Sequence, residues 1–148
     1  MTNAYQVYTG ARQLLEGYAA AMQPLCRREG LAPNGVDILL FLANNPGLDT
    51  ARDICTYRGL KPGIVSFHVE KLVQEGCLLR QPAPEDRRKC RLVCTRRAEP
   101  VVQRGRQVQE AFFRRMTAGL DPQDLAAFRR CLEGFQRNLS QMTQEDDQ

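Results

Sequence analysis

The sequence predicts a mainly α-helical fold with one small β-hairpin, and three observations support this prediction. Near both ends of the chain, apolar residues recur at alternating spacings of three and four, as they do on one face of a helix. Between these ends lie two short helical segments that are bounded by glycine and proline. After Gly76 the periodicity changes to that of two short strands around a proline-containing turn.

The composition is that of one ordinary globular domain. The chain has 148 residues, of which 43% are hydrophobic and 26% are charged, and we expect a single domain over residues 1–148. The longest apolar run, Val36 to Ala43, is interrupted by Asp37 and is far shorter than the roughly 18 residues of a membrane helix. Met1 to Tyr5 lacks the basic start and apolar core of a secretory signal. We therefore expect a cytoplasmic protein with no membrane segment.

The first predicted helix has a broad apolar face and ends where breaker residues gather between Gly30 and Gly35. Its main stripe consists of Val7, Ala11, Leu14, Tyr18, Ala21 and Leu25. The next segment, Val36 to Leu42, is nearly all apolar, which predicts either a buried helix or a buried strand. The Asn44-Asn45-Pro46-Gly47 sequence that follows is typical of the end of a helix.

Two short helices joined by a tight turn form a predicted helix-turn-helix. Thr50 is placed to cap the first helix, and Gly59 is placed to end it. Pro62 suits the first turn of the second helix, because the N–H that proline lacks would be unpaired there. The second helix ends at Gly76, and in this motif it is the helix that enters a major groove of DNA.

A basic hairpin follows the helix-turn-helix. Cys77 to Arg80 and Lys89 to Thr95 are predicted as two strands, with Gln81 to Arg88 as the loop between them. Two further helices complete the chain. One runs from about Glu99 to Met116, and the other opens at Asp121-Pro122, where an aspartate cap and a proline at the first position are both favourable. The last helix carries an unbroken apolar repeat of Leu125, Phe128, Leu132, Phe135, Leu139 and Met142.

Charge is unevenly distributed along the chain. From Thr50 to Arg106 there are 13 Lys or Arg against 6 Asp or Glu, a net of +7, whereas the rest of the chain has a net of −3. Arginine makes up 18 of the 21 basic residues, and its planar guanidinium suits phosphates and guanine edges. The basic middle of the chain therefore predicts a polyanion, first of all nucleic acid, as the partner.

The sequence lacks the residues of common catalytic and metal sites. None of the six cysteines forms a Cys-x-x-Cys pair, and His68 is the single histidine. No glycine-rich phosphate loop or nucleophile motif is present. We therefore expect a binding protein rather than an enzyme, with no cofactor and no metal.

The order of these elements, with two local motifs, resembles the MarR family of winged helix-turn-helix transcription regulators. Val65-Ser66-x-x-Val69-x-x-Leu72-x-x-x-Gly76-x-x-x-Arg80 matches that family's recognition helix and the strand after it. Pro84-Glu85-Asp86-Arg87-Arg88-x-x-x-Leu92-x-Cys94-Thr95 is close to its wing, in which Asp86 and Arg88 occupy the Asp-x-Arg positions. The resemblance implies a winged helix-turn-helix lobe over residues 36–95, with long N- and C-terminal dimerisation helices at 4–29 and 99–142.

The resemblance implies a homodimer that binds double-stranded DNA at an inverted repeat. It also implies that the protein is a repressor, which a small-molecule or redox signal releases from the DNA. Family members respond to small aromatic or anionic effectors, for which Tyr18, Met22 and the segment around Arg28 are candidate contacts, although core packing also explains Tyr18 and Met22. Cys26 is the candidate sensor thiol, although a free buried cysteine is the commoner alternative. The alternative is a helical dimeric protein-interaction module with no specific DNA target.

Nine residues are candidates for DNA contact. Lys61, Lys71 and Arg80 are expected at phosphates, which position the protein without reading sequence. Ser66 and Phe67 are expected at base edges, with the Phe67 ring on a thymine methyl, although core packing is an equal alternative for Phe67. Many family members have a polar or basic residue at position 67 and a serine-like cap at position 61. The wing supplies the remaining candidates: Arg88 in a minor groove, Asp86 holding Arg88 in position, and Arg87 and Lys89 at phosphates or solvent.

Overall fold

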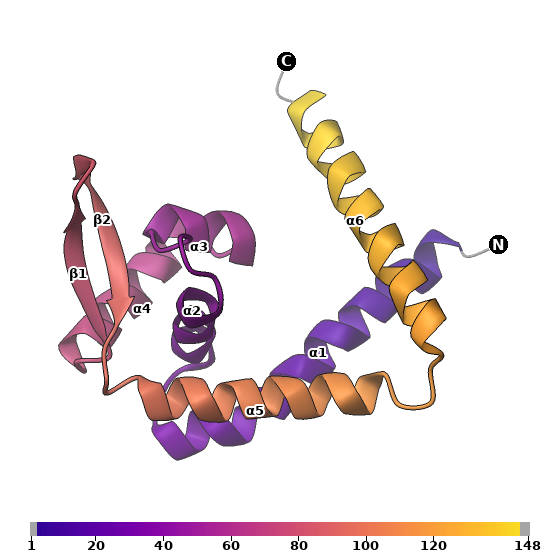
Figure 1. The fold of residues 1–148 in the computed structure, drawn as a ribbon, viewed down its shortest axis with the longest axis horizontal. Helices are drawn as coiled ribbons and strands as arrows, with labels where there is room; N and C mark the ends of the chain where they lie inside the picture. Colours follow the sequence, from indigo (N-terminus) through magenta and orange to yellow (C-terminus); the bar gives the residue numbers. More distant parts are fainter. Residues whose placement is uncertain (1–2, 146–148) are drawn as a thin grey trace. The chain divides into compact units, whose positions relative to one another are not determined.

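The structure is a computed structural model that describes residues 3–145, apart from the side chains of Arg87 and residues 143–145. Its elements, in chain order, are α1 (Ala4–Glu29), α2 (Pro33–Asn44), α3 (Ala51–Arg58), α4 (Pro62–Gln74), β1 (Leu78–Ala83), β2 (Asp86–Cys94), α5 (Glu99–Met116) and α6 (Pro122–Glu145) (Figure 1). The predicted mainly helical fold with a small hairpin is confirmed. Val36 to Leu42 forms a helix and not a strand.

Backbone contacts divide the chain into two compact units, one ending at Phe112 and the other beginning at Phe113. The first unit holds α1 to α4, the hairpin and most of α5, and the second holds α6. The expected organisation, with one domain, a central lobe at 36–95 and dimerisation helices on either side, stays a prediction. No described helix has the length and apolar character needed to cross a membrane.

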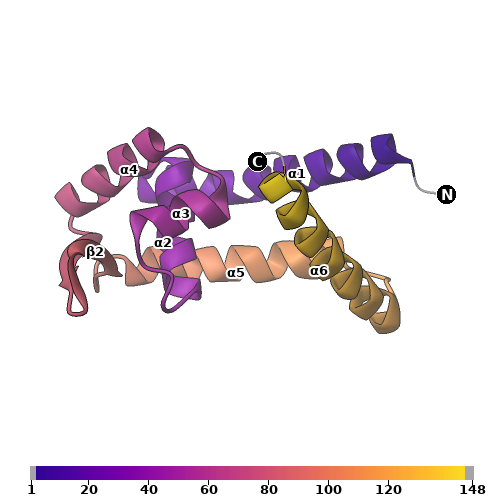
Figure 2. The same ribbon diagram turned by 90° about the horizontal axis from the view of Figure 1, so that it is seen from above.

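The core of the first unit is built around α2. Val36, Ile38, Leu39 and Leu40 are almost completely buried, and α2 contacts α1, α4 and β2. Ile54 of α3, Val65 and Leu72 of α4 and Leu78 of β1 join the same cluster. Figure 2 shows α3 and α4 lying against α2, with the hairpin beside them. The buried faces of the short helices thus settle which of their residues face solvent.

Helix α5 is fixed to α2 at a point of very close approach. A Cβ on Gly105 would lie 2.7 Å and 2.9 Å from the two δ-carbons of Leu40, distances that real Cβ atoms almost never show. Nearby, Arg106 Nε donates to Asn44 Oδ1 at 2.8 Å, and Asn44 Nδ2 donates to Gln109 Oε1 at 3.1 Å. Gln109 Nε2 in turn donates to the Tyr18 hydroxyl at 2.8 Å. These hydrogen bonds join α5 to both α2 and α1.

The hairpin is longer than the sequence predicted. Its strands are antiparallel, with Leu78 opposite Cys94 and Pro82 opposite Cys90, and only Pro84 and Glu85 form the turn. The prediction of a loop from Gln81 to Arg88 is therefore wrong. Pro82 is tolerated in β1 because both strands of a two-stranded sheet are edge strands, where a missing N–H need not break a ladder. The irregular pairing between Pro82 and Ala83 marks the approach to the turn.

The contact between Gly105 and Leu40 makes a testable prediction about stability. Gly105→Ala should lower the free energy of unfolding by about 1 kcal/mol, because overpacking a buried contact (~1–3 kcal/mol) outweighs the helix propensity gained (~1 kcal/mol). Urea unfolding at one fixed protein concentration measures the difference. The matched control is Gly63→Ala in α4, whose added methyl meets no atom within 4 Å and should not destabilise. Equal stability of both variants would contradict the packing.

Candidate nucleic-acid interface

The first helix of the helix-turn-helix, α3, is held by a complete capping box. The Thr50 hydroxyl accepts from the Asp53 backbone N–H at 3.1 Å, and Asp53 Oδ2 accepts from the Thr50 backbone N–H at 2.9 Å. At the other end Gly59 has φ of 65°, a left-handed conformation that glycine adopts without strain. The Arg58 guanidinium binds both carboxylate oxygens of Asp37 in α2, at 2.6 Å and 2.8 Å. These contacts fix α3 although it has only eight residues.

Helix α4 turns a polar and aromatic face to solvent. Val65, Val69 and Leu72 face the core, so Ser66, Phe67 and Lys71 are exposed on the other side. Phe67 is 62% exposed, and the alternative that it packs in the core is wrong. Its ring meets the His68 ring edge-on, with the centroids 5.1 Å apart and the planes at 84°.

The start of α4 departs from the helix capping seen in α3. Pro62 occupies the first turn, as predicted, but Lys61 at the N-cap position makes no side-chain capping hydrogen bond. The Lys61 side chain is instead exposed to solvent at the N-terminal end of α4.

Only some of the basic residues of the hairpin lack an acidic partner. Arg80 pairs with Glu70 of α4, with 2.8 Å between Nη2 and Oε2. Arg91 pairs with Glu85 at the turn and lies 3.9 Å from Asp49, which precedes α3. A backbone N–H and the Arg91 guanidinium lower the pKa of Glu85, so this carboxylate stays charged. Arg91 thus braces the hairpin, a role that the sequence analysis missed because the pairing spans separate elements.

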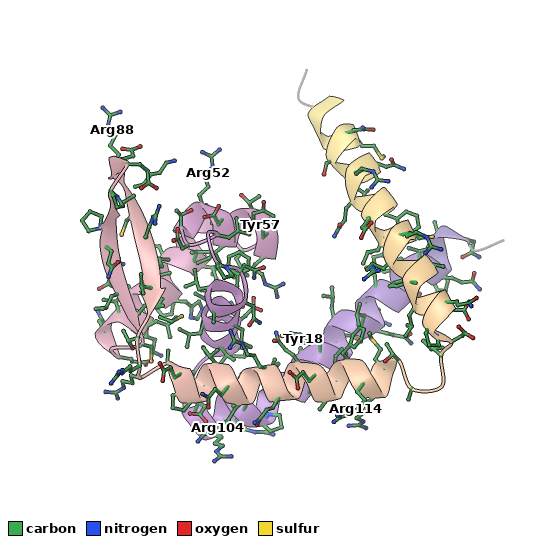
Figure 3. The ribbon with its side chains drawn as sticks, in the orientation of Figure 1. Tyr18, Arg52, Tyr57, Arg88, Arg104 and Arg114 are labelled. Atoms are coloured by element: carbon green, nitrogen blue, oxygen red, sulfur yellow. The ribbon has the colours of Figure 1, made fainter. Side chains whose placement is uncertain are left out.

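The tip of the hairpin presents Arg88. Asp86 Oδ1 accepts from the Arg88 backbone N–H at 2.9 Å, so Asp86 orients the backbone of Arg88 rather than its guanidinium. Arg88 and Lys89 are exposed, and among the described residues neither has an ion pair. The Arg87 side chain lies outside the described residues. Figure 3 shows Arg88 and Arg52 projecting on one side of the first unit, and Arg104 on the other.

Arg52 is a residue that the sequence analysis did not single out as a DNA contact. It lies in the first turn of α3, beside a cavity of about 380 Å³ between α3, α4 and the hairpin. The signal available in the sequence was its place two residues after the capping Thr50, within the basic middle of the chain. Residues lining the cavity are Ala51, Arg52, Cys55, Pro62, Ser66, Val69, Arg80, Cys90 and Leu92. Two predicted DNA contacts, Ser66 and Arg80, thus line the same cavity.

The candidate sensor thiol is poorly placed for reaction with oxidants. Cys26 is only 5% exposed, and burial raises the pKa of its thiol, which disfavours the reactive thiolate. Burial likewise raises the pKa of Cys77 and of Cys94. Cys90 and Cys131 are the exposed thiols among the described residues. Within residues 3–145 no group of three His, Cys, Asp or Glu side chains is arranged to hold a metal ion.

The side chains of Tyr18 and Met22, the candidate effector contacts, both make packing contacts within the protein. Met22 is buried in the core, and Tyr18 packs edge-on against Phe112 with 5.7 Å between ring centroids. Burial raises the pKa of Tyr18, whose hydroxyl accepts the hydrogen bond from Gln109. Arg28, in the last turn of α1, is exposed.

Two helices joined by a tight turn, followed directly by an antiparallel hairpin with an arginine at its tip, define a winged helix-turn-helix. Residues 29–89, which contain α2 to α4 and most of the hairpin, match the sequence model of the MarR family. This match shows that the lobe is similar to the MarR family of transcription regulators, and the whole chain has the fold of MarR itself, at 19% identity and a TM-score of 0.75. No protein of curated function matches the sequence.

Solved structures share the fold over nearly the whole chain. A MarR-family regulator from Silicibacter pomeroyi has a TM-score of 0.76 at 21% identity, covering 86% of each chain. CouR from Rhodococcus jostii RHA1, solved bound to p-coumaroyl-CoA, has a TM-score of 0.70 at 19% identity, covering 87% of each chain. BpsR from Bordetella bronchiseptica, whose DNA binding is regulated by 6-hydroxynicotinic acid, has a TM-score of 0.69 at 20% identity, covering 92% of this chain and 96% of BpsR.

Proposed function

We propose that this protein is a cytoplasmic transcription regulator, not an enzyme, that binds an inverted-repeat DNA site as a homodimer and represses transcription. The observation that carries the proposal is the exposed face of α4, where Ser66, Phe67 and Lys71 lie in the same lobe as the unpaired Arg88 of the hairpin. A helix of this kind enters a major groove, and an arginine at a hairpin tip suits the adjacent minor groove.

The charge pattern of the lobe supports the same proposal. Arg80 and Arg91 are engaged by carboxylates, so the cations left for phosphates are Lys61, Lys71 and Lys89, with Arg52 on the first helix. Phosphate contacts of this kind fix the register of the protein on the duplex, whereas the base contacts select the sequence. Arg87 stays a predicted contact on sequence grounds alone.

The test of DNA binding is selection from a random duplex pool at near-physiological salt. We expect an enriched inverted repeat with half-sites about 10 base pairs apart, the spacing of two recognition helices related by a two-fold axis. Arg88→Ala should weaken binding of the enriched duplex at least tenfold, because the tip cation is lost from the minor groove. Titration by fluorescence anisotropy at matched salt measures both affinities.

The matched control for that titration is Arg115→Ala, which removes the same charge from an exposed position on the last turn of α5. It should bind as the wild type does. An equal loss of affinity in both variants would mean that Arg88 contributes only its charge and makes no specific contact. If no sequence is enriched and all duplexes bind weakly and equally, the protein-interaction module becomes the better account of the basic lobe.

The proposal of a homodimer is supported by apolar residues left exposed on the terminal helices. In α6 they repeat at three and four along one stripe, formed by Phe128, Leu132, Phe135, Leu139 and Met142. In α1 they are Tyr5, Val7, Tyr8, Leu14 and Leu15. Contiguous apolar surface of this extent marks an interface, and a two-fold interface presents the same stripes from both subunits.

A charge placed in the α6 stripe should disrupt the dimer. Phe135→Glu should shift the protein from dimer to monomer in sedimentation velocity, because an unpaired carboxylate would be buried in the apolar interface. Gln136→Glu adds the same charge at a neighbouring polar position of α6 and should leave the dimer intact. A wild-type protein that sediments as a monomer would remove the homodimer from the proposal.

We propose that a small aromatic or anionic effector, rather than oxidation of Cys26, releases the protein from DNA. The burial and raised pKa of Cys26 speak against a thiol signal at that position. CouR and BpsR, which share the fold, are described with an aromatic CoA thioester and an aromatic acid.

Thermal unfolding with a panel of aromatic acids that includes 6-hydroxynicotinic acid tests this proposal. A ligand that binds the folded state raises the melting temperature, by an amount that grows with its concentration relative to Kd. The same compound should lower the affinity for the enriched duplex. A flat response to every acid, with loss of DNA binding on peroxide treatment and recovery with reductant, would instead assign the signal to a thiol.

A further inference from the structure

The solvent face of α4 carries two large apolar side chains that the packing of the lobe does not require. Phe67 is 62% exposed and Ile64 is 42% exposed, and they are three residues apart on the same side of the helix. The core face of α4 is already supplied by Val65, Val69 and Leu72. Ile64 and Phe67 therefore form a second apolar surface, which we call the apolar ridge.

Contacts within α4 restrict the conformation of the apolar ridge, and the space beside the ridge is open to the edge of a base. The edge-on contact with the His68 ring limits the orientations of the Phe67 ring. Gly63, one turn before Phe67, has no side chain, and a Cβ there would meet no atom within 4 Å. The edge of a base can thus approach both the ring and the helix backbone beside it.

The charges around the ridge favour DNA over an apolar protein surface. Lys71 follows Phe67 by one turn, and Lys61 lies at the start of the helix. Glu70, the acidic residue next to this face, is paired with Arg80. The ridge is therefore an apolar strip between two cations, which matches a base edge between two phosphate backbones.

In the major groove, the C5-methyl of thymine is the apolar group that base pairs present. An apolar side chain set against the donor of cytosine or the acceptors of guanine would desolvate them without giving a hydrogen bond, at a cost in free energy. We infer that Ile64 and Phe67 read thymine methyl groups, so that each half-site carries thymine opposite the N-terminal half of α4. This inference rests on the proposed DNA binding and adds the chemistry by which the site is selected.

The test uses two random pools that differ by one methyl group per thymine, one containing thymine and the other deoxyuridine throughout. Deoxyuridine pairs with adenine in the same way and lacks only the C5-methyl. The wild-type protein should enrich a thymine-containing half-site from the first pool. Replacing each contacted thymine by deoxyuridine should weaken binding about fourfold, the value of one buried methyl group.

Phe67→Ala and Ile64→Ala should each bind the thymine duplex more weakly and lose most of this sensitivity to deoxyuridine, as a double-mutant cycle would show. Both residues are exposed, so the variants should fold normally. The matched control is Leu79→Ala, an exposed apolar residue of β1, which should keep the full methyl effect.

The outcomes separate the inference from the proposed function. Enrichment of the same sequence from both pools, with equal affinities, would overturn methyl reading and leave sequence-specific DNA binding intact. An equal methyl effect in the wild type, Phe67→Ala and Ile64→Ala would also overturn it. No enrichment from either pool would overturn the inference together with the proposed function.

Discussion

Helix α2 is apolar around most of its circumference, and the first unit is organised by the need to cover it. A helix of this kind cannot remain at a surface, so α1, α4 and β2 pack directly against it. Two of its polar side chains fix neighbouring helices: Asp37 holds α3 through Arg58, and Asn44 holds α5 through Arg106 and Gln109. Leu40 of α2 also packs against Gly105 of α5. The position of each helix around α2 is therefore determined by its contacts with α2.

This central packing has a direct effect on the surface of the lobe. Because Val65, Val69 and Leu72 must face α2 and its neighbours, the rotation of α4 about its axis is fixed. Ser66, Phe67 and Lys71, which lie between them in the sequence, therefore face solvent. In the same way, the Asp86 contact and the Arg91 pairs fix the hairpin turn and leave Arg88 projecting. Ion pairs and core contacts together decide which polar groups of the lobe remain available.

Local signals in the sequence were sufficient for the two short helices of the helix-turn-helix. Thr50, Gly59 and Pro62 act over one or two turns, so capping and breaking rules locate α3 and α4 correctly. Position-specific burial was harder, because Phe67 changes from core to surface with a shift of one residue in the assumed helix register. The pairing of Arg80 with Glu70 joins residues of two elements and follows from their packing, which periodicity does not describe. The length of the hairpin was underestimated because prolines at 82 and 84 are typical of loops, whereas an edge strand accepts one of them.

Among the described residues, the contacts that attach the hairpin to the rest of the first unit lie towards its base. The Leu92 backbone N–H donates to the Asp49 carbonyl at 2.7 Å, and Leu78 and Leu92 are buried, whereas residues 88 to 90 are exposed. Changes of residue at the tip therefore leave the core contacts untouched, and so do changes on the exposed face of α4. A lineage carrying this fold can alter the surfaces proposed here to contact DNA at little cost in stability. Mutations that retarget such a protein are open to selection one at a time, without a compensating change in its interior.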